Sequence, residues 1–592
     1  MPPSNQKMKK QMRMKTKSVH IVFLFALLLW SNTSLAQANS PKDSLDTQLV
    51  KVVKPYTPKI SDAFKLKHSP ALDNQQTKPK EAIEYTIFSI PVASTFTPAK
   101  TKSLGLEQLK REKKFNSIVS LSGGNYTSIN GNLFLNKQLA KGKNLSAFLS
   151  HQSSQGGIKE VFLDDGFSTN TAQFKYAIDQ RGLNWNIAVD AQRFMTNWYG
   201  LASDFDTEQN QSFDAKQVVS IFEAKGGLNV NEGVFKSAKA NIYTLSDDFN
   251  SNEMRAQFGA NLDLNILNTP IQTHLNIDFL NGTFQQNDNN AQPLDFGNFM
   301  ASLSPTYKFE RPNLVLNLGL KTVYFNDIER SKQKFYVYPN ISASYVVVNS
   351  ILIAYTGIEG DLMQNTYRDL YAINSFVSPT LNIRPTSMPY KFFLGTKGKL
   401  SKSLSYDVSG VFSRQNDAVF FQKNAAQTTL AQQPYSYGNS FGLVYDDLET
   451  FSVKGSLLFQ VSNAFNFSAS SSFNSFSLSS EEKAWNLPEL ELSFGVRYQP
   501  TERLNLGIQG FYQGSRYDLE KQTLLPTYVL QEQQIELESF FDLNIDATYE
   551  LTSRWFATLK LNNILGKNYQ RWMHYRVQGV QASAGAFYKF DF

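Results

Sequence analysis

The sequence predicts an all-β protein: a transmembrane antiparallel β-barrel of about 22 strands, preceded by a short irregular N-terminal periplasmic segment. Three observations predict it: an export signal at the start, a long series of segments in which apolar and polar residues alternate, and connections that are short on one side and long on the other. The 592 residues include no cysteine, which excludes disulfides, thiolate metal sites and attachment of lipid through cysteine.

The first 36 residues are predicted to be a secretory signal peptide. Six basic residues precede the apolar run 21–30, and Ser34-Leu35-Ala36 forms a cleavage site of the small-x-small type. The apolar run is too short for a helix that crosses a membrane, which needs about 20 residues. Removal of the signal takes away six positive charges and no negative ones, so the net charge of +7 falls close to +1. The charge therefore gives no reason to expect a nucleic-acid partner.

Alternation with period 2 begins near Phe115 and continues to the end of the chain. In "LELSFGVRY", Leu492 lies on the apolar face and Glu491 on the polar face; in "FDLNIDATYE", Leu543 and Asp542 are separated in the same way. We expect the leucines to face lipid and the carboxylates to face the lumen. A soluble β-sandwich also alternates, but a series of more than 450 residues is far longer than a sandwich domain. The residues 115–592, with 46 Phe and 27 Tyr in the whole chain, fit a membrane barrel better.

The connections divide into two classes. Short ones such as "RGLN", "NTP" and "PTER" alternate with long ones such as "DLMQNTYRDLYAINSFVSPTLNIRPTSMPY" (361–390) and "RQNDAVFFQKNAAQTTLAQQPYSYG" (414–438). Short turns inside and long loops outside are typical of the outer membrane of Gram-negative bacteria, and an even strand count places both termini in the periplasm. The stretch 441–459 keeps one phase throughout, so we expect a single long strand whose top stands clear of the membrane.

The last strand ends in alternating aromatic residues. To close the barrel it must pair with the first strand, which would hold the end of the chain in place. The aromatic residues of this end resemble the C-terminal sorting signal of outer-membrane barrels, which implies recognition by the barrel-assembly machinery. The residues concerned are Tyr588, Phe590 and Phe592.

Residues 115–592 resemble the barrel of TonB-dependent receptors. "WFATLKLNNILGKNYQRW" followed by "YRVQGVQASAGAFYKFDF" is similar to the last two strands of that family, and "AWNLPELELSFGVRY" resembles receptors of the Bacteroidetes type. The resemblance implies 22 strands, uptake of a nutrient across the outer membrane, and a globular plug ahead of the barrel. The plug is not recognisable here.

The leader, residues 37–114, stands where the plug would be expected. It holds seven prolines and a net charge of +6, whereas residues 115–592 carry −5. A run within 45–53 resembles the TonB box; the alternative is a solvated linker with a similar sequence. The most apolar part, within 84–114, is predicted to fill part of the lumen; the alternative is a short periplasmic strand. The residues are Leu49, Val50, Val52 and Val53 for the TonB box, and Ile87, Phe88, Ile90 and Phe96 for the lumen.

The sequence shows no constellation for catalysis, metal or cofactor binding, and we predict that the protein is not an enzyme. Ser153 shares a strand face with His151, so a Ser–His pair is conceivable, but no acidic residue at a suitable spacing completes a triad. Two functions remain: nutrient uptake energised through TonB, and a non-transporting structural subunit of an outer-membrane assembly or secretion complex with a periplasmic or lipoprotein partner. Outer-membrane lipid surrounds the barrel in both. The histidines of the mature chain are scattered: His68, His151, His274 and His574.

Overall fold

The computed structural model describes residues 115–592 except 203–212, 286–291, 428–432, 463 and 525–528. The predicted signal peptide and leader, with the TonB-box-like residues and the lumen-filling residues, lie outside the described residues. Among the described residues, no helix has both the length and the apolar character needed to cross a membrane, a finding that says nothing about a β-barrel.

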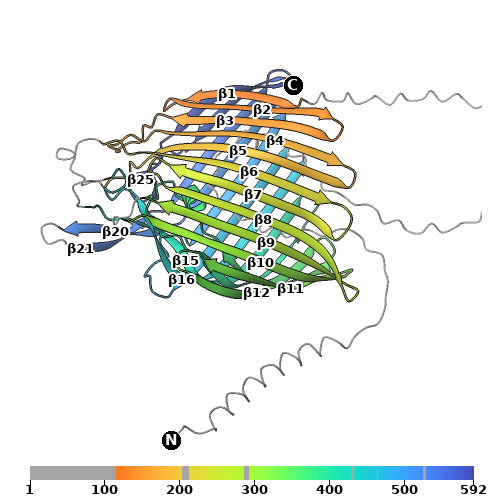
Figure 1. Cartoon of the computed structure of the whole chain (residues 1–592). Coiled ribbons are helices and arrows are strands. Elements are labelled where there is room, and N and C mark those ends of the chain that lie inside the picture. The colour runs from red at the N-terminus through yellow and green to blue at the C-terminus, as the bar shows by residue number, and fades with distance from the viewer. Residues whose placement is uncertain (1–114, 203–212, 286–291, 428–432, 463, 525–528) are drawn as a thin grey trace, which may run out of the picture. The chain divides into compact units, whose positions relative to one another are not determined.

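Twenty-two antiparallel strands form one closed sheet (Figure 1). Each strand pairs with the next, and β1 (Ser117–Gly124) pairs with β26 (Gln581–Phe590), which closes the ring. The strand count predicted from the sequence is confirmed. The other strands of the barrel are β2 Ser128–Ala140, β3 Lys143–Ser154, β4 Phe167–Gln180, β5 Leu183–Asn197, β6 Lys216–Val230, β7 Phe235–Asp247, β8 Asn252–Ile266, β9 Thr269–Phe284, β10 Leu294–Arg311, β11 Leu314–Asp327, β12 Lys332–Val348, β13 Leu352–Met363, β14 Thr386–Lys399, β15 Leu404–Lys423, β16 Phe441–Ser462, β17 Phe465–Leu478, β18 Leu490–Thr501, β19 Leu504–Gln513, β22 Phe540–Glu550 and β23 Trp555–Asn562.

In the described part of the chain, a hairpin, a short strand pair and a helix lie outside the barrel sheet. The hairpin β20–β21 projects from the connection between β19 and β22, and the short pair β24–β25 lies between β23 and β26. The helix α2 belongs to the connection between β13 and β14. Their bounds are β20 Arg516–Leu524, β21 Val529–Leu537, β24 Gln570–Trp572, β25 Tyr575–Arg576 and α2 Tyr367–Ile373.

The two faces of the wall follow the predicted alternation. The side chain of Leu492 is 42% exposed on the outer face, whereas Asp542 is buried and accepts a hydrogen bond from the Tyr569 hydroxyl at 2.7 Å, on the lumen side. On the outer face, the rings of Phe494 and Phe541 stack 6.3 Å apart. The predicted register of these two strands is therefore confirmed.

The connections are short at one end of the barrel and mostly long at the other, as predicted. We call these the short-turn end and the long-loop end. The predicted long strand is present as β16, but the predicted loop 414–438 is wrong in its first part, because β15 continues to Lys423. The reason is pairing: the upper half of β16 gives β15 a partner, and an irregularity between Gln415 and Ala418 keeps the two in register.

The closure of the barrel fixes the end of the chain. β26 pairs with β1 from Ser117↔Phe590 to Gly124↔Ser583. The regular strand ends at Phe590, and the backbone N–H of Phe592 donates to the Asn116 Oδ1 at 3.0 Å. The terminal residue is thus positioned although its side chain is 54% exposed.

Deleting Phe592 is expected to lower the yield of folded barrel in a Gram-negative host, because the aromatic end resembles a sorting signal and the residue itself is not needed to fill a core. The measurement is the fraction of protein that shifts on heating in gel electrophoresis, compared with wild type and with Phe592→Tyr as the control. Equal yields for the deletion and the wild type would contradict the sorting role.

Candidate functional site

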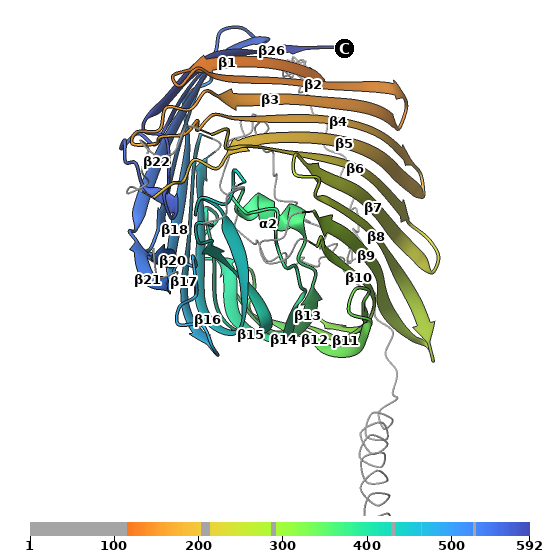
Figure 2. The same ribbon diagram turned by 60° about the vertical axis from the view of Figure 1, so that its left-hand side comes forward.

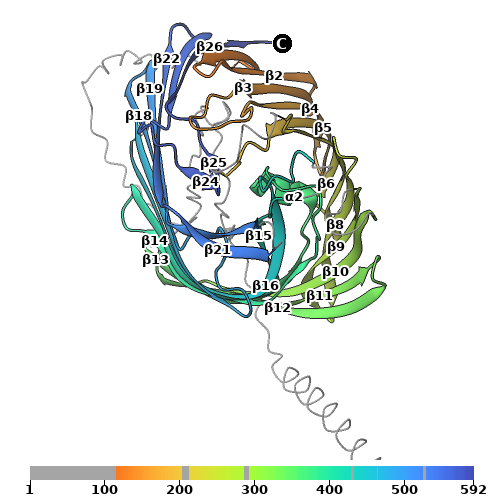
Figure 3. The same cartoon turned by 90° about the vertical axis from the view of Figure 1, so that its left-hand side faces the viewer.

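Loops from the long-loop end fold back into the lumen and pack against one another. We call this the loop assembly and define it as residues 198–202, 364–385, 433–440 and 563–580. Figures 2 and 3 show α2 inside the ring of strands, and Figure 3 shows β24 and β25 inside it as well. The loop assembly is the best candidate for the functional site, because it lies in the lumen of the barrel.

The helix α2 forms at the inner turn of the segment 364–385. Thr366 caps its N-terminus, accepting a hydrogen bond from the Asp369 N–H at 3.0 Å, and Asp369 places a negative charge in the first turn. At the other end, the backbone N–H of Asn374 bonds to the carbonyl of Leu370, and Asn374 is extended. These local signals stop the helix after seven residues.

One face of α2 is buried against the inner wall. Tyr367 is fully buried and Leu370 is 2% exposed, and they pack on the inward side chains of β6, β7, β9 and β10. The ring of Tyr367 meets the ring of Phe284 edge-on at 5.0 Å. Burial of a large apolar side chain contributes about 1.5–3 kcal/mol, so this face stabilises the folded position of the loop. The wall residues are Val219, Ile221, Tyr243, Leu245, Leu280, Phe284 and Phe296.

A buried carboxylate at the upper end of β8 holds the start of the helix. Glu253 is 1% exposed, and its oxygens accept the backbone N–H of Tyr367 at 2.5 Å and of Arg368 at 3.1 Å. It also accepts the Tyr243 hydroxyl at 2.8 Å. Two N–H groups without partners inside the helix are thereby satisfied by one carboxyl group, which makes Glu253 the main polar anchor of the loop.

Charged side chains join α2 to the wall in a second place. The guanidinium of Arg368 lies 2.8 Å from the carboxylate of Glu223, which also contacts Lys225 at 2.9 Å. Arg255 makes two hydrogen bonds to Asp278, at 2.9 and 2.6 Å. Positive and negative groups therefore alternate along the wall beneath the helix, and each acidic group in this set has a basic neighbour.

The second half of the loop assembly is an aromatic cluster. Phe376 from the segment 364–385 stacks on Tyr575 with ring centroids 3.6 Å apart, and Tyr199 meets Tyr575 edge-on at 4.8 Å. Trp572 packs on Phe441, at the top of β16. Three connections that are far apart in sequence are thus locked together, and movement of one requires movement of the others.

Burial sets the protonation of several side chains in the loop assembly. It raises the pKa of the Tyr371 hydroxyl to about 12 and the pKa of Tyr367 well above its ordinary value. Both groups therefore stay neutral and keep their hydrogens at physiological pH. Burial lowers the pKa of the Arg571 guanidinium, although the group remains positively charged at neutral pH.

The sequence predicts a long connection at 361–390, and the structure has it at 364–385, folded into the lumen. The available signal is composition: "YRDLYAINSFVSPTLNI" is too apolar for a solvated loop. Asp542 faces the lumen as predicted and contacts a lumen group, and Asp278 does the same on β9. In the described part of the chain, no group of three or more histidine or acidic side chains could hold a metal ion.

The closed 22-stranded sheet with inward loops defines a large antiparallel β-barrel. Similar solved structures include the FrpB iron transporter of Neisseria meningitidis (10% identity, TM-score 0.59, 81% of this chain and 82% of that chain). The siderophore receptor PirA of Acinetobacter baumannii is similar too (8%, 0.59, 81% and 81%). A third is the ferripyoverdine receptor of Pseudomonas aeruginosa (14%, 0.56, 81% and 72%). At these identities the similarity establishes the fold. No protein-family model matches the sequence, and no curated protein matches it.

Proposed function

We propose that this protein is an outer-membrane receptor that takes up a nutrient with energy supplied through TonB. The observation that carries the proposal is the loop assembly: a closed 22-stranded barrel holds a packed set of long loops in its lumen, where a ligand entering from the long-loop end must meet them. The similar structures are transporters and receptors for iron and siderophores, so ferric siderophores are the first ligand class to test. The long-loop end faces outwards, and both termini are periplasmic.

The resemblance of residues 115–592 to receptors of the Bacteroidetes type supports this proposal, and so does the TonB-box-like run at 45–53. We further propose that no globular plug precedes the barrel and that residues 84–114 share the closing of the lumen with the loop assembly. The loop assembly supports a shared closing of the lumen, because it already places a packed aromatic cluster inside the ring of strands.

Replacing Val50 and Val52 together by proline is expected to lower uptake of a radiolabelled ferric siderophore to the level of a strain without the TonB energiser. Proline removes the backbone N–H groups with which a segment adds to the sheet of a partner. Leu66→Pro is the control in the same leader, and it should leave uptake unchanged. Normal uptake in the energiser-deficient strain would contradict the proposal. In that case, recovery of a stoichiometric partner in mild detergent would support the structural subunit instead.

A further inference from the structure

A serine, a histidine and an asparagine form a hydrogen-bonded chain on β3 and β4. The Nε2 atom of His151 lies 3.0 Å from the Ser153 Oγ, and its Nδ1 atom lies 2.7 Å from the Asn170 Oδ1. An amide oxygen only accepts hydrogen bonds, so Nδ1 carries the hydrogen and Nε2 is free to accept the proton of the serine hydroxyl. This is the arrangement of nucleophile, general base and orienting group that activates a hydroxyl for attack on an acyl carbon.

The strand pairing explains why the three side chains meet. His151 and Ser153 are two residues apart on one strand, so they point to the same face, and the register of the sheet places Asn170 directly opposite His151. The sequence therefore shows two members of the set. The third member is the amide of Asn170, on the neighbouring strand, in place of an acidic side chain. Because Asn170 is 19 residues from His151, the sequence alone does not show that the two meet.

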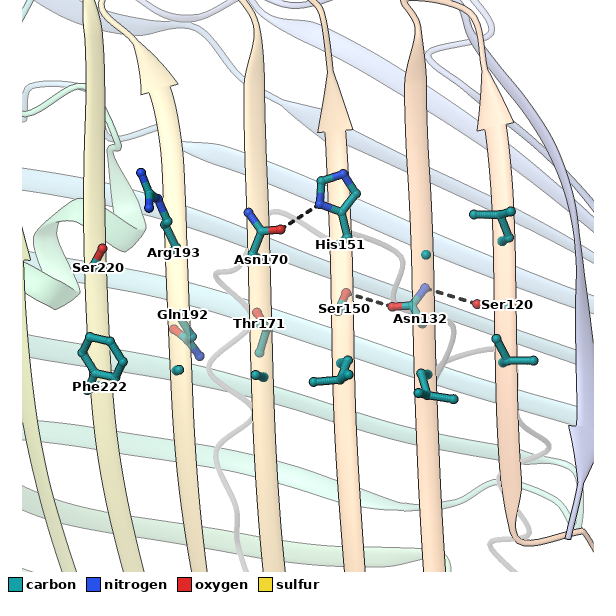
Figure 4. A pocket seen from close by; sticks show the side chains of 17 residues that line it. Ser120, Asn132, Ser150, His151, Asn170, Thr171, Gln192, Arg193, Ser220 and Phe222 are labelled. Carbon is teal, nitrogen blue, oxygen red and sulfur yellow. Dashed lines mark hydrogen bonds between the residues drawn. The ribbon is translucent and has the colours of Figure 1, made fainter. Parts of the chain in front are cut away.

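The chain of three faces outwards. Leu149, on the same face of β3 as His151, is 41% exposed, whereas the intervening Ser150 points to the lumen side and bonds to Asn132. Figure 4 looks at this wall from outside, with the strands of the opposite wall behind it. His151 and Asn170 lie close to the long-loop end of their strands, so the serine stands near the boundary between the hydrocarbon and the headgroups of the membrane.

An apolar hollow of about 700 Å³ is lined by His151 and Asn170 (Figure 4), and Ser153 lies two residues further along β3 toward the long-loop end. The outward residues of the hollow include Gly131, Ala172 and Ala191, which carry little or no side chain. Leu149 lies within this surface, paired with Ala172, and Phe222 lies at one border. The hollow is open along its outer side, so an occupant would remain in contact with the surrounding lipid. Its apolar walls suit an acyl chain, and its upper end opens toward His151.

A cation completes the site. Arg193 is paired with Asn170 across the sheet and lines the same hollow on the outer face. It has no ion pair with any of the described residues. An arginine on the lipid face destabilises a barrel by about 2–4 kcal/mol at the midplane and by about 0–1 kcal/mol near the interface, so it needs an anionic neighbour or a headgroup position. A phosphate, which guanidinium groups bind with two hydrogen bonds, meets that need.

We propose that this outward face is an acyl-ester hydrolase site for phospholipids of the surrounding membrane, independent of nutrient uptake and contrary to the prediction from the sequence that the protein is not an enzyme. Ser153 Oγ attacks the ester carbonyl carbon while His151 Nε2 takes its proton. The bond to the lysophospholipid oxygen breaks, and that oxygen receives the proton from His151. A water molecule then attacks the acyl-serine in the same way, so that one ester and one water become one fatty acid and one lysophospholipid. Asn170 is a positioning residue, and Arg193 holds the phosphate.

The test uses the full-length protein, folded and heat-modifiable, in mixed micelles of dodecyl maltoside and phosphatidylethanolamine. Wild type is expected to release fatty acid and to react with a fluorophosphonate probe. Ser153→Ala and His151→Gln should each lower the release by at least 100-fold and abolish the labelling. Ser150→Ala, on the lumen face of the same strand, is the matched control and should retain both. Asn170→Ala should lower the release about tenfold, while Asn170→Asp restores it with the acidic limb of the pH profile moved upward.

Two results would overturn the proposal: a wild-type protein that neither releases fatty acid nor reacts with the probe, or release that persists in Ser153→Ala. Hydrolysis of a soluble short-chain ester without release from phosphatidylethanolamine would overturn the assignment of a membrane lipid as the substrate.

Discussion

Replacing Glu253 by alanine is expected to release the segment 364–385 from the wall while the barrel stays closed. The carboxyl group accepts two backbone N–H groups of α2 and the Tyr243 hydroxyl, and these contacts are buried or partly buried. Leaving a buried donor without an acceptor costs roughly 1–3 kcal/mol, so the loss of these three hydrogen bonds should cost at least about 3 kcal/mol. Since about 1.4 kcal/mol corresponds to a factor of ten, the open population of the loop should rise at least 100-fold.

Two measurements follow this change. Trypsin should cleave after Arg368 at least 100-fold faster, since cleavage of a briefly opened segment depends on its open population. Single-channel conductance in planar bilayers should rise as the loop leaves the lumen. The matched control is Asp263→Ala at the short-turn end of the same strand, whose exposed ion pair with Lys236 spans 3.7 Å and contributes about 0–1 kcal/mol. Protection of Arg368 in Glu253→Ala as complete as in wild type would show that apolar packing alone holds the loop.

Replacing Ile508 by arginine is expected to destabilise the barrel by roughly 2–4 kcal/mol, because the residue faces lipid in the middle of β19. Its pairing partners across the sheet are Val496 and Ile545, and these three form an apolar layer on the outer face. The neighbour Gln509 pairs with Gly495 and Asn544 and faces the lumen. Arginine at Gln509 should therefore change the stability by about 1 kcal/mol or less.

The measurement is the free energy of unfolding in guanidinium chloride, with the protein in lipid vesicles and tryptophan fluorescence as the signal. The comparison of adjacent positions tests the register of the strand, since a shift by one residue exchanges the two faces. A larger loss for Gln509→Arg than for Ile508→Arg would show that the two faces are assigned in reverse.

The side-chain contacts of the loop assembly and of the outward site could not be predicted from the sequence, for the same reason in both cases. Glu253 and Tyr367 are 114 residues apart, and His151 and Asn170 are 19 apart on different strands. Period-2 alternation tells which face a residue takes but not which residue of another strand stands opposite. The aromatic content of 364–385 was a usable sign that this loop is covered, yet no local rule names the covering wall.

By itself, the sequence determined the class of fold, the number of strands and the face that each strand turns to lipid. These properties are local: alternation repeats every two residues, the turn residues divide the strands, and the bilayer requires that every strand find a partner. The tertiary structure alone decided what fills the lumen and which polar groups meet. Those contacts depend on the register of pairs and on loops that cross the barrel, and their energies come from side chains that are distant in sequence and adjacent only after the ring has closed.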